Sequence, residues 1–170
     1  MKVIYRSCQL IVFLSLLPLF YGCVTSPNGD IPEKKQTELG LYLTATETND
    51  LLKKEGENIL FVDVRTRAEI AQGAPTYIDN HVPIIEKRNK KGVFNKDFVT
   101  VIEDRLEEKG LNKQDKIILI CKRGHRSATA TNTLAQAGYK TVYSVIDGAD
   151  GWKENNLPWI DKVEKEKLYF

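Results

Sequence analysis

The stretch from Lys116 to Gln136 constrains this chain more than any other part of the sequence. It opens with four consecutive aliphatic residues, Ile117 to Ile120, a pattern typical of a strand buried on both faces of a parallel sheet. A short polar loop begins at Cys121, and from Ser127 the sequence becomes rich in alanine, which predicts a helix that ends at Gly138. The chain therefore places one thiol at a turn from a buried strand into a helix.

The residues after Cys121 favour the ionised form of this thiol. The unpaired N–H groups and the positive dipole end of the following helix attract an anion. Lys122, Arg123 and Arg126 add formal positive charge in the same loop. Because the thiolate is the reactive form of cysteine, we interpret Cys121 as a nucleophile. The alternative is a structural cysteine buried at the end of a core strand.

The loop resembles the active-site loop of the single-domain rhodaneses, which reads Cys-x-x-Gly-x-Arg-Ser. The matching residues are Cys121, Lys122, Arg123, Gly124, His125, Arg126 and Ser127. Cysteine phosphatases, including those that share the rhodanese fold, have a longer Cys-x5-Arg loop that is wide enough for phosphate. The resemblance implies an α/β fold with a central, mostly parallel sheet flanked by helices on both faces, and an active loop at the carboxyl ends of the strands.

The resemblance also implies a sulfurtransferase that works through a persulfide on Cys121. The thiolate would take the outer sulfur of a small anionic donor such as thiosulfate and pass it to cyanide or a thiol, with no metal or cofactor. The residues implied to bind the substrate are those of the loop: Lys122, Arg123, Gly124, His125, Arg126 and Ser127. Their backbone N–H groups would cradle the sulfur, while Arg126 and Arg123 would hold the sulfonate.

Two other functions remain open at this stage. The domain could be a non-catalytic module that binds a partner or carries sulfur for it, although a pure binding module has no use for a reactive thiol. A cysteine phosphatase or arsenate reductase is disfavoured by the short loop. The length of the loop and the retained cysteine therefore favour sulfur transfer.

A second stretch resembles another rhodanese signature. Residues 59–64 predict a buried strand, and Asp63, Val64 and Arg65 match the Asp-Val-Arg sequence that ends the first central strand of that family. The resemblance implies that Asp63 and Arg65 support the active loop from behind; the alternative is that they only pair with each other. Thr66 and Glu69 have capping-box spacing, which predicts a short helix after this strand.

The remaining segments complete an alternating pattern of strands and helices. We expect a short strand at residues 42–43, a helix from an N-cap at Thr46 to Gly56, a helix over residues 97–109 and a buried strand over residues 141–146. Residues 147–152 resemble the glycine-rich C-terminal signature of rhodaneses, and we interpret Trp152 as a core residue.

Two segments depart from the family or carry no clear signal. Residues 72–83 differ from the family's usual sequence; we expect a short edge strand, in which His81 is either a structural histidine, the reading we prefer, or a residue at the rim of the site. Residues 87–92 are basic, and we expect a solvated loop.

The N-terminus predicts export. Residues 1–22 have a basic start, an apolar stretch from Cys8 to Phe20 and a candidate cleavage point before Cys23, as in a signal peptide. This end resembles a bacterial lipobox, in which Cys23 would be lipidated; the alternative is an uncleaved signal anchor. We expect residues 23–40 to be a flexible tether, residues 41–160 the domain and residues 161–170 a polar tail. The protein would then be an extracytoplasmic lipoprotein, held at the membrane of the periplasm.

The cysteine and charge counts support this interpretation. Once Cys8 is removed and Cys23 is acylated, Cys121 is the only free thiol among the three cysteines of the chain, so no internal disulfide can form. The chain has 25 basic and 23 acidic residues, and removal of Lys2 and Arg6 leaves 23 of each. A net charge near zero argues against nucleic acid as a partner.

Overall fold

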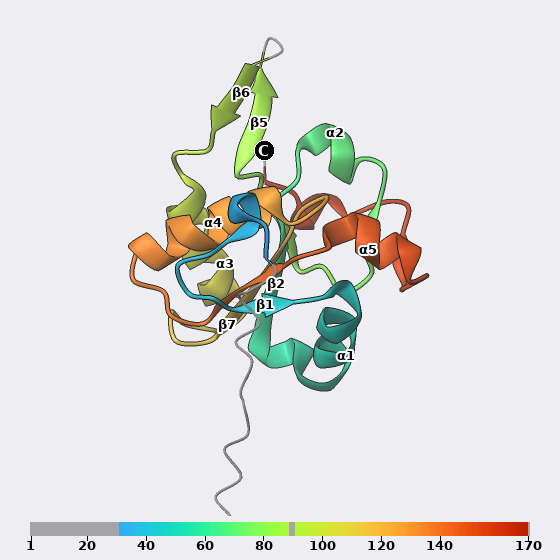
Figure 1. The fold of residues 1–170 in the computed structure, drawn as a ribbon, viewed down its shortest axis with the longest axis horizontal. Coiled ribbons are helices and arrows are strands. Elements are labelled where there is room, and N and C mark those ends of the chain that lie inside the picture. Colours follow the sequence, from blue (N-terminus) through green and yellow to red (C-terminus); the bar gives the residue numbers. More distant parts are fainter. Residues whose placement is uncertain (1–30, 89–90, 170) are drawn as a thin grey trace, which may run out of the picture.

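A five-stranded parallel sheet forms the centre of the molecule (Figure 1). The structure is a computed structural model, and it describes residues 31–88 and 91–169. In spatial order the strands are β1 (Tyr42–Leu43), β8 (Val142–Val145), β7 (Lys116–Ile120), β2 (Ile59–Asp63) and β4 (Asn80–His81). The α/β class, the parallel sheet and the edge strand that ends at His81 are as predicted.

Helices cover both faces of this sheet, as Figure 1 shows. One face packs against α3 (Phe98–Glu108) and α4 (His125–Gln136), and the other against α1 (Ala45–Glu55), α2 (Arg67–Ile70) and α5 (Gly148–Glu154). Alternate side chains of β7 pack into the hydrophobic cores on the two faces of the sheet. Ile117 and Leu119 belong to the core under α3 and α4, and Ile118 and Ile120 to the core under α1, α2 and α5. The unbroken aliphatic run is therefore buried on both sides, which is why it lacks polar alternation.

Helix starts follow from local hydrogen bonds. Thr66 and Glu69 form the predicted capping box at α2. At α1 the prediction was wrong by two residues, because the cap is Thr44 and not Thr46. The hydroxyl of Thr44 accepts a hydrogen bond from the N–H of Glu47 at 3.2 Å, and the Glu47 carboxylate accepts one from the N–H of Thr44 at 2.8 Å. This reciprocal pair satisfies two free N–H groups at once, so it starts the helix earlier.

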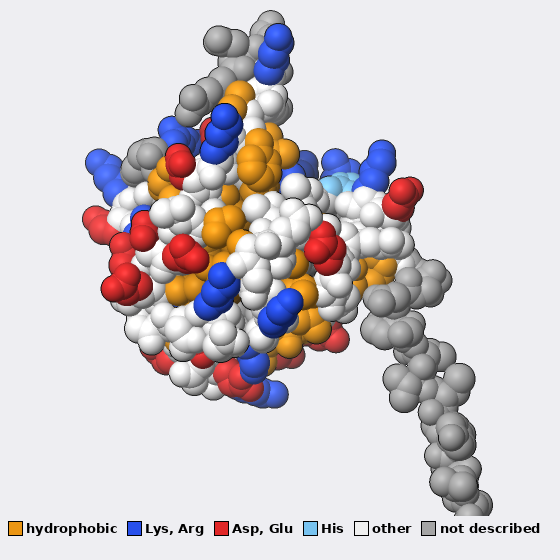
Figure 2. All heavy atoms as spheres, turned by 90° about the vertical axis from the view of Figure 1, so that its left-hand side faces the viewer, with side chains coloured by type: hydrophobic (Ala, Val, Ile, Leu, Met, Phe, Trp, Pro, Cys, Tyr) orange, Lys and Arg blue, Asp and Glu red, His pale blue; other side chains and the backbone are white. Residues whose placement is uncertain are grey.

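A β-hairpin replaces the solvated loop that we expected at residues 87–92. Strands β5 (Ile85–Arg88) and β6 (Lys91–Phe94) pair in antiparallel register and project from the body of the molecule (Figure 1). Hydrophobic side chains gather where the hairpin joins the body (Figure 2). Val93 and Phe94 are 40% and 46% exposed. The high content of basic residues, on which the prediction of a loop depended, did not reveal these two strands.

The segment before the domain is ordered where the structure describes it. We expected residues 23–40 to be a flexible tether, but residues 31–40 contain the short helix η2 (Glu33–Lys35) and pack against α4. The Lys35 ammonium donates to the carbonyl of Ile146 at 3.0 Å, and the N–H of Glu38 donates to the Asn132 side chain at 2.8 Å. These hydrogen bonds to the domain hold the segment in place, although its polar, proline-containing composition suggested disorder.

The C-terminal segment is also part of the fold and not a free polar tail. Val163 is 7% exposed, and the N–H of Tyr169 donates to the carbonyl of His81 at 3.0 Å. Leu168 forms a parallel bridge with His81, so this segment, with its short helix η4 (Lys165–Lys167), covers the edge strand β4. Just before it, β9 (Trp159–Ile160) pairs with β3 (Ala74–Pro75) in a second small sheet.

The predicted signal peptide at residues 1–22 and the predicted lipidation site at Cys23 lie outside the described residues. Within the part of the chain that the structure describes, no helix combines the length and the apolar character that a bilayer crossing requires.

Candidate active site

The thiol of Cys121 lies directly after β7, at the point where α4 begins. Its side chain is buried, and the N–H of Gly124 donates a hydrogen bond to the Sγ at 3.1 Å. Helix α4 starts at His125, two residues earlier than the sequence indicated, because Gly124 acts as its N-cap. The sulfur therefore faces the positive end of a helix of twelve residues, as the sequence predicted.

Gly124 makes this approach of backbone and sulfur feasible. Its φ of +89° lies in the left-handed region, which favours glycine. A Cβ at this position would lie 2.3 Å from the carbonyl oxygen of Ile146, at the end of the neighbouring strand β8. The loop is thus pressed against β8, and only a residue without a side chain fits there.

A pair of buried serines lies behind the sulfur. The Ser127 hydroxyl lies 3.6 Å from the Cys121 Sγ and donates to the carbonyl of Gly124 at 3.1 Å. Ser144 of β8 donates to the Ser127 hydroxyl at 2.8 Å. Sequence reasoning did not find Ser144, because nothing in the sequence near it distinguishes it from any other strand serine; it reaches the loop only because β8 pairs with β7, where Ser144 lies opposite Leu119.

Helix α5 holds the first residues of the loop. The N–H of Ala149 donates to the carbonyl of Cys121 at 2.8 Å, and the N–H of Asp150 donates to the carbonyl of Lys122 at 3.0 Å. Gly148 allows the contact, since a Cβ there would lie 2.5 Å from the Cys121 carbonyl oxygen. The C-terminal glycine-rich segment therefore positions the loop, whereas Trp152 packs in the core against Phe61, with ring centroids 5.8 Å apart.

Arg126 forms an ion pair with Glu69 of α2. Its guanidinium donates to both carboxylate oxygens of Glu69, at 2.6 and 2.7 Å. Partial burial by itself raises the pKa of Glu69, but hydrogen bonds from Arg126 and Thr66 outweigh it and lower the pKa to about 2. The same contact raises the pKa of Arg126. Arg126 therefore ties the loop to α2, and its charge is already matched by a carboxylate.

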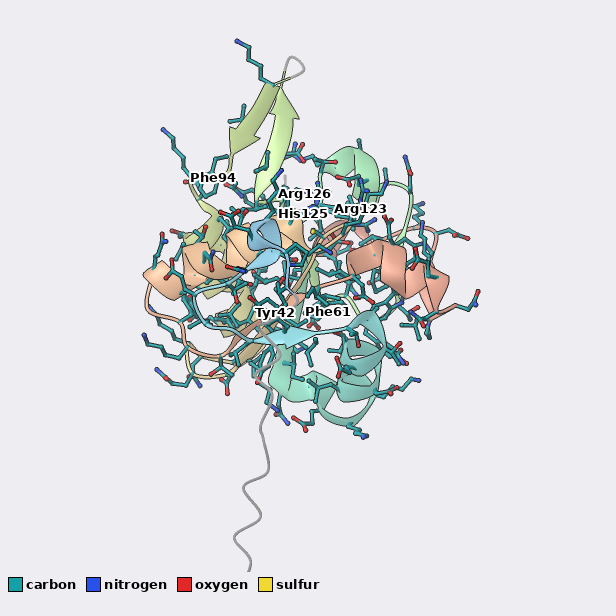
Figure 3. All side chains as sticks on the ribbon, viewed as in Figure 1. Tyr42, Phe61, Phe94, Arg123, His125 and Arg126 are labelled. Atoms are coloured by element: carbon teal, nitrogen blue, oxygen red, sulfur yellow. The ribbon has the colours of Figure 1, made fainter. Side chains whose placement is uncertain are left out.

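The other charged loop residues are exposed. The Arg123 Nε lies 3.6 Å from a carboxylate oxygen of Asp150, and its side chain is 67% exposed. Lys122 and His125 are also exposed. Figure 3 shows Arg123, His125 and Arg126 on one side of the molecule, between the β5–β6 hairpin and α5.

Asp63 and Arg65 form a buried ion pair beside the loop. The Arg65 guanidinium lies 2.6 Å from the Asp63 carboxylate and also donates to the carbonyl of Gly73 at 2.8 Å. The N–H of Val64 donates to the carbonyl of Ile120 at 2.8 Å, which links this turn to the residue before Cys121. The pair thus shapes the wall of the site, with no hydrogen bond to Cys121 in the described part of the chain.

His81 lies in the interior, which agrees with the structural interpretation of this residue. Its Nε2 is 2.8 Å from the carbonyl oxygen of Arg65. Burial lowers the pKa of His81, although the Arg65 carbonyl acts in the opposite direction. The ring is therefore neutral near pH 7, with Nε2 as the donor.

A cleft of about 150 Å³ opens between α2 and α5, and Lys122 of the active loop is part of its lining. Its lining includes Arg65, Glu69, Gln72, Lys122, Asp150 and Lys153. A larger cavity of about 560 Å³ lies between α2 and the C-terminal segment, and no residue of the active loop lines it. Size therefore does not identify the candidate site; the position of the thiol does.

Fold and site together define a class of protein: a single α/β domain with a cysteine at the turn between a central parallel strand and a helix. The chain belongs to the rhodanese family, since the family described as Rhodanese-like domain matches residues 44–155.

The chain is also similar in sequence to other proteins. An uncharacterised protein of Rickettsia conorii is 32% identical over 126 residues, which cover 69% of this chain and 94% of that protein. Thiosulfate sulfurtransferase 16, chloroplastic, from Arabidopsis thaliana is 32% identical over 98 residues, which cover 58% of this chain and 77% of that protein.

Solved structures share the fold. The polysulfide-sulfur transferase homodimer of Wolinella succinogenes is 26% identical, with a TM-score of 0.50, and the match covers 74% of this chain and 81% of that one. Rv0390 from M. tuberculosis has a TM-score of 0.56 at 24% identity, over 70% of this chain and 96% of that one. The high coverage of the second structure fits a single-domain form.

Proposed function

We propose that this protein is a sulfurtransferase that moves sulfane sulfur from a small anionic donor such as thiosulfate to a thiophilic acceptor. The observation that carries the proposal is the position of the Cys121 Sγ at the N-terminus of α4, where it accepts a hydrogen bond from the N–H of Gly124. An anionic sulfur is stabilised there, both as the attacking thiolate and as the terminal sulfur of a persulfide.

The first half-reaction is a displacement at sulfur. The Cys121 thiolate attacks the outer sulfur of thiosulfate, a new S–S bond forms, the old S–S bond breaks, and sulfite leaves with the electron pair. In the second half-reaction the acceptor attacks the outer sulfur of the persulfide, and the Cys121 thiolate is restored. No net oxidation or reduction is needed, because one sulfane sulfur is carried through both steps.

The comparisons support this chemistry through the names of similar proteins. One relative is named a thiosulfate sulfurtransferase, and one similar solved structure is a polysulfide-sulfur transferase. Thiosulfate and polysulfide both contain sulfane sulfur, so both donors should be tried. An exposed lysine and arginine directly after Cys121 are suited to anionic donors of either kind.

Intact-mass measurement after incubation with thiosulfate or polysulfide tests the proposal. We expect the protein to gain one sulfur atom on Cys121, to lose it on addition of cyanide and to release thiocyanate. Cys121→Ser should fold normally and show neither reaction, because a hydroxyl cannot store a sulfane sulfur. Ser144→Ala is a useful companion, since it removes a buried hydroxyl near the loop but keeps the thiol.

Other outcomes would redirect the proposal. Absence of the added sulfur in the wild type with both donors would contradict sulfur transfer and favour a binding module. Hydrolysis of an aryl phosphate that depends on Cys121 would favour a phosphatase. Thiocyanate formation by Cys121→Ser near the wild-type rate would show that the persulfide mechanism is wrong.

We also propose that the domain acts outside the cytoplasm as a lipoprotein anchored through Cys23. The support is the apolar N-terminal stretch and the Gly22-Cys23 pair in the sequence. Metabolic labelling with a fatty-acid analogue should mark the wild type and Cys8→Ala but not Cys23→Ala, which should accumulate as an unprocessed precursor. Label that persists in Cys23→Ala would exclude this site and favour an uncleaved anchor.

A further inference from the structure

The cleft between α2 and α5 has an unusual balance of charge. Two carboxylates line it, Glu69 and Asp150, but each faces an arginine of the active loop. Glu69 is held by Arg126 through two short hydrogen bonds, and Asp150 lies 3.6 Å from Arg123. The loop arginines and these acids thus balance each other, and the other cations of the cleft determine its net charge.

Two lysines supply that remaining charge. Within residues 31–88 and 91–169, neither Lys122 nor Lys153 has a carboxylate within ion-pair distance. The Lys153 ammonium lies 4.3 Å from the centre of the Trp159 ring, and the Arg65 guanidinium lies 5.4 Å from the centre of the same ring. Trp159 therefore holds the ammonium group of Lys153, a lining residue of the cleft, by a cation–π contact.

The position of the cleft connects it with the reaction. Lys122 directly follows the nucleophile, and Ala149 and Asp150, also in the lining, donate their N–H groups to the carbonyls of Cys121 and Lys122. The sulfonate of thiosulfate is bonded directly to the outer sulfur that the Cys121 thiolate attacks, so it would lie within the loop. Lys153 comes from α5, outside the loop, and suits an anionic group several bonds away from the reacting sulfur.

We propose that this cleft is the acceptor subsite and that it takes a small thiol carrying a carboxylate. The carboxylate binds between Lys122 and Lys153, and the thiol points toward Cys121. A volume of about 150 Å³ corresponds to about five water molecules at ~30 Å³ each, which suits a three-carbon thiol acid. The inference rests on the proposed sulfur transfer and adds to it the acceptor class and Lys153 as a specificity residue.

The transfer step balances without a further reactant. The acceptor thiolate attacks the outer sulfur of the Cys121 persulfide and forms the new S–S bond of the product. The bond between that sulfur and the Cys121 Sγ breaks, and its electron pair returns to Cys121 as a thiolate. The terminal sulfur of the Cys121 persulfide takes up a proton from water before the transfer, and this proton stays on the transferred sulfur. A thiolate and a protonated persulfide thus give a new protonated persulfide and a thiolate.

A single-turnover experiment on the full chain tests the acceptor class. The Cys121 persulfide is formed with thiosulfate, verified by intact mass and separated from the remaining donor. Its decay is then followed after addition of 3-mercaptopropionate or 2-mercaptoethanol. Each decay rate is divided by the thiolate concentration of the acceptor, so that the two acceptors can be compared. We expect the thiol acid to react about ten times faster at low salt, and the advantage to shrink at high salt.

Variants of Lys153 test the residue. Lys153→Gln should lower the ratio of the two acceptor rates about five-fold, and Lys153→Arg should restore it, because the charge and the cation–π contact return. Lys140→Gln is the matched control. Lys140 is exposed and precedes the amino-terminal end of β8, whereas the active loop lies at the carboxyl ends of the strands, so its variant should keep the wild-type ratio.

Three results would overturn the inference. An unchanged ratio in Lys153→Gln would exclude Lys153 from acceptor binding. A Lys153→Gln variant in which persulfide formation from thiosulfate slows as much as transfer to the thiol acid would make the cleft a donor subsite. Failure of the wild type to form a persulfide would be seen by mass before any acceptor is added, and it would reject the sulfur-transfer proposal together with this one.

Discussion

Replacing Glu69 by glutamine tests whether the ion pair with Arg126 stabilises the folded domain. The two side chains meet through hydrogen bonds of 2.6 and 2.7 Å, and Glu69 also accepts a hydrogen bond of 2.6 Å from the Thr66 hydroxyl. The pair links α2 to the start of α4. Glutamine has nearly the same shape but no charge, so the substitution removes the electrostatic part of the contact.

The magnitude follows from the pKa of Glu69. A decrease from the ordinary value of 4.5 to about 2, at about 1.4 kcal/mol per pKa unit, corresponds to roughly 3 kcal/mol for all interactions of the Glu69 carboxylate, those with Arg126 and with Thr66 together. Solvent reaches both side chains, which are 24% and 28% exposed, and screening lowers the expected loss in Glu69→Gln to about 1–2 kcal/mol at pH 7.

The sign of the pH dependence is set by the lowered pKa. A carboxyl group that is more acidic in the folded state stabilises the protein above its unfolded pKa of about 4.5, and this stabilisation is lost as the pH falls toward 2. Urea unfolding at pH 7, 5 and 3 should show the largest difference between wild type and Glu69→Gln at pH 7, little change at pH 5 and a clearly smaller difference at pH 3.

Two controls separate the pair from other effects. Glu108→Gln breaks a more exposed ion pair with Arg105 on α3 and should cost less than about 0.5 kcal/mol. A double-mutant cycle with Arg126→Gln should give a coupling of about 1–2 kcal/mol for Glu69 and Arg126. A coupling near zero, or a wild-type advantage that stays constant from pH 7 to pH 3, would refute the electrostatic explanation.

Two further predictions concern backbone geometry and burial. Gly124→Ala should destabilise the domain by more than the ~1–2 kcal/mol that a left-handed alanine costs, because its Cβ would meet the Ile146 carbonyl. The control is Gly110→Ala, at a φ of +73° with no atom within 4 Å of its Cβ, which should lose only this conformational energy. Equal losses of stability for the two variants in thermal unfolding would contradict the prediction. Burial lowers the pKa of His81 below 6.5, so the stability that it contributes is complete above pH 6.5 and falls at lower pH; the free energy of unfolding of wild type relative to His81→Gln should decrease from pH 7.5 to 5, and a constant difference would show that the ring is not held neutral.

Much of the fold could be predicted because its signals are local. The aliphatic run before Cys121 indicates burial on both faces of a sheet without reference to any other segment. Thr66 and Glu69 form their capping box across three residues, and Gly138, with a φ of +91°, ends α4 as its position suggested. These signals depend on nearest neighbours along the chain, which the sequence displays directly.

The errors occurred where a segment meets a partner that is distant in sequence. Residues 31–40 have the composition of a linker, but Lys35 bonds to Ile146 and Glu38 to Asn132. The C-terminal segment is polar, but it covers the edge strand at His81. Free backbone groups at a sheet edge need partners, and composition does not reveal which segment provides them.

The sequence by itself determined the class of fold, the family resemblance and the position of Cys121 at a strand-to-helix turn, since all three depend on residue types at fixed short spacing. Only the tertiary structure decided how the loop charges are used. Arg126 lies 57 residues from Glu69 along the chain, and Lys153 shares a cleft with Lys122 only because α5 packs on the loop. The field at the thiol depends on which charges are already paired, and that pairing is set by distances in space, which a linear order of residues does not contain.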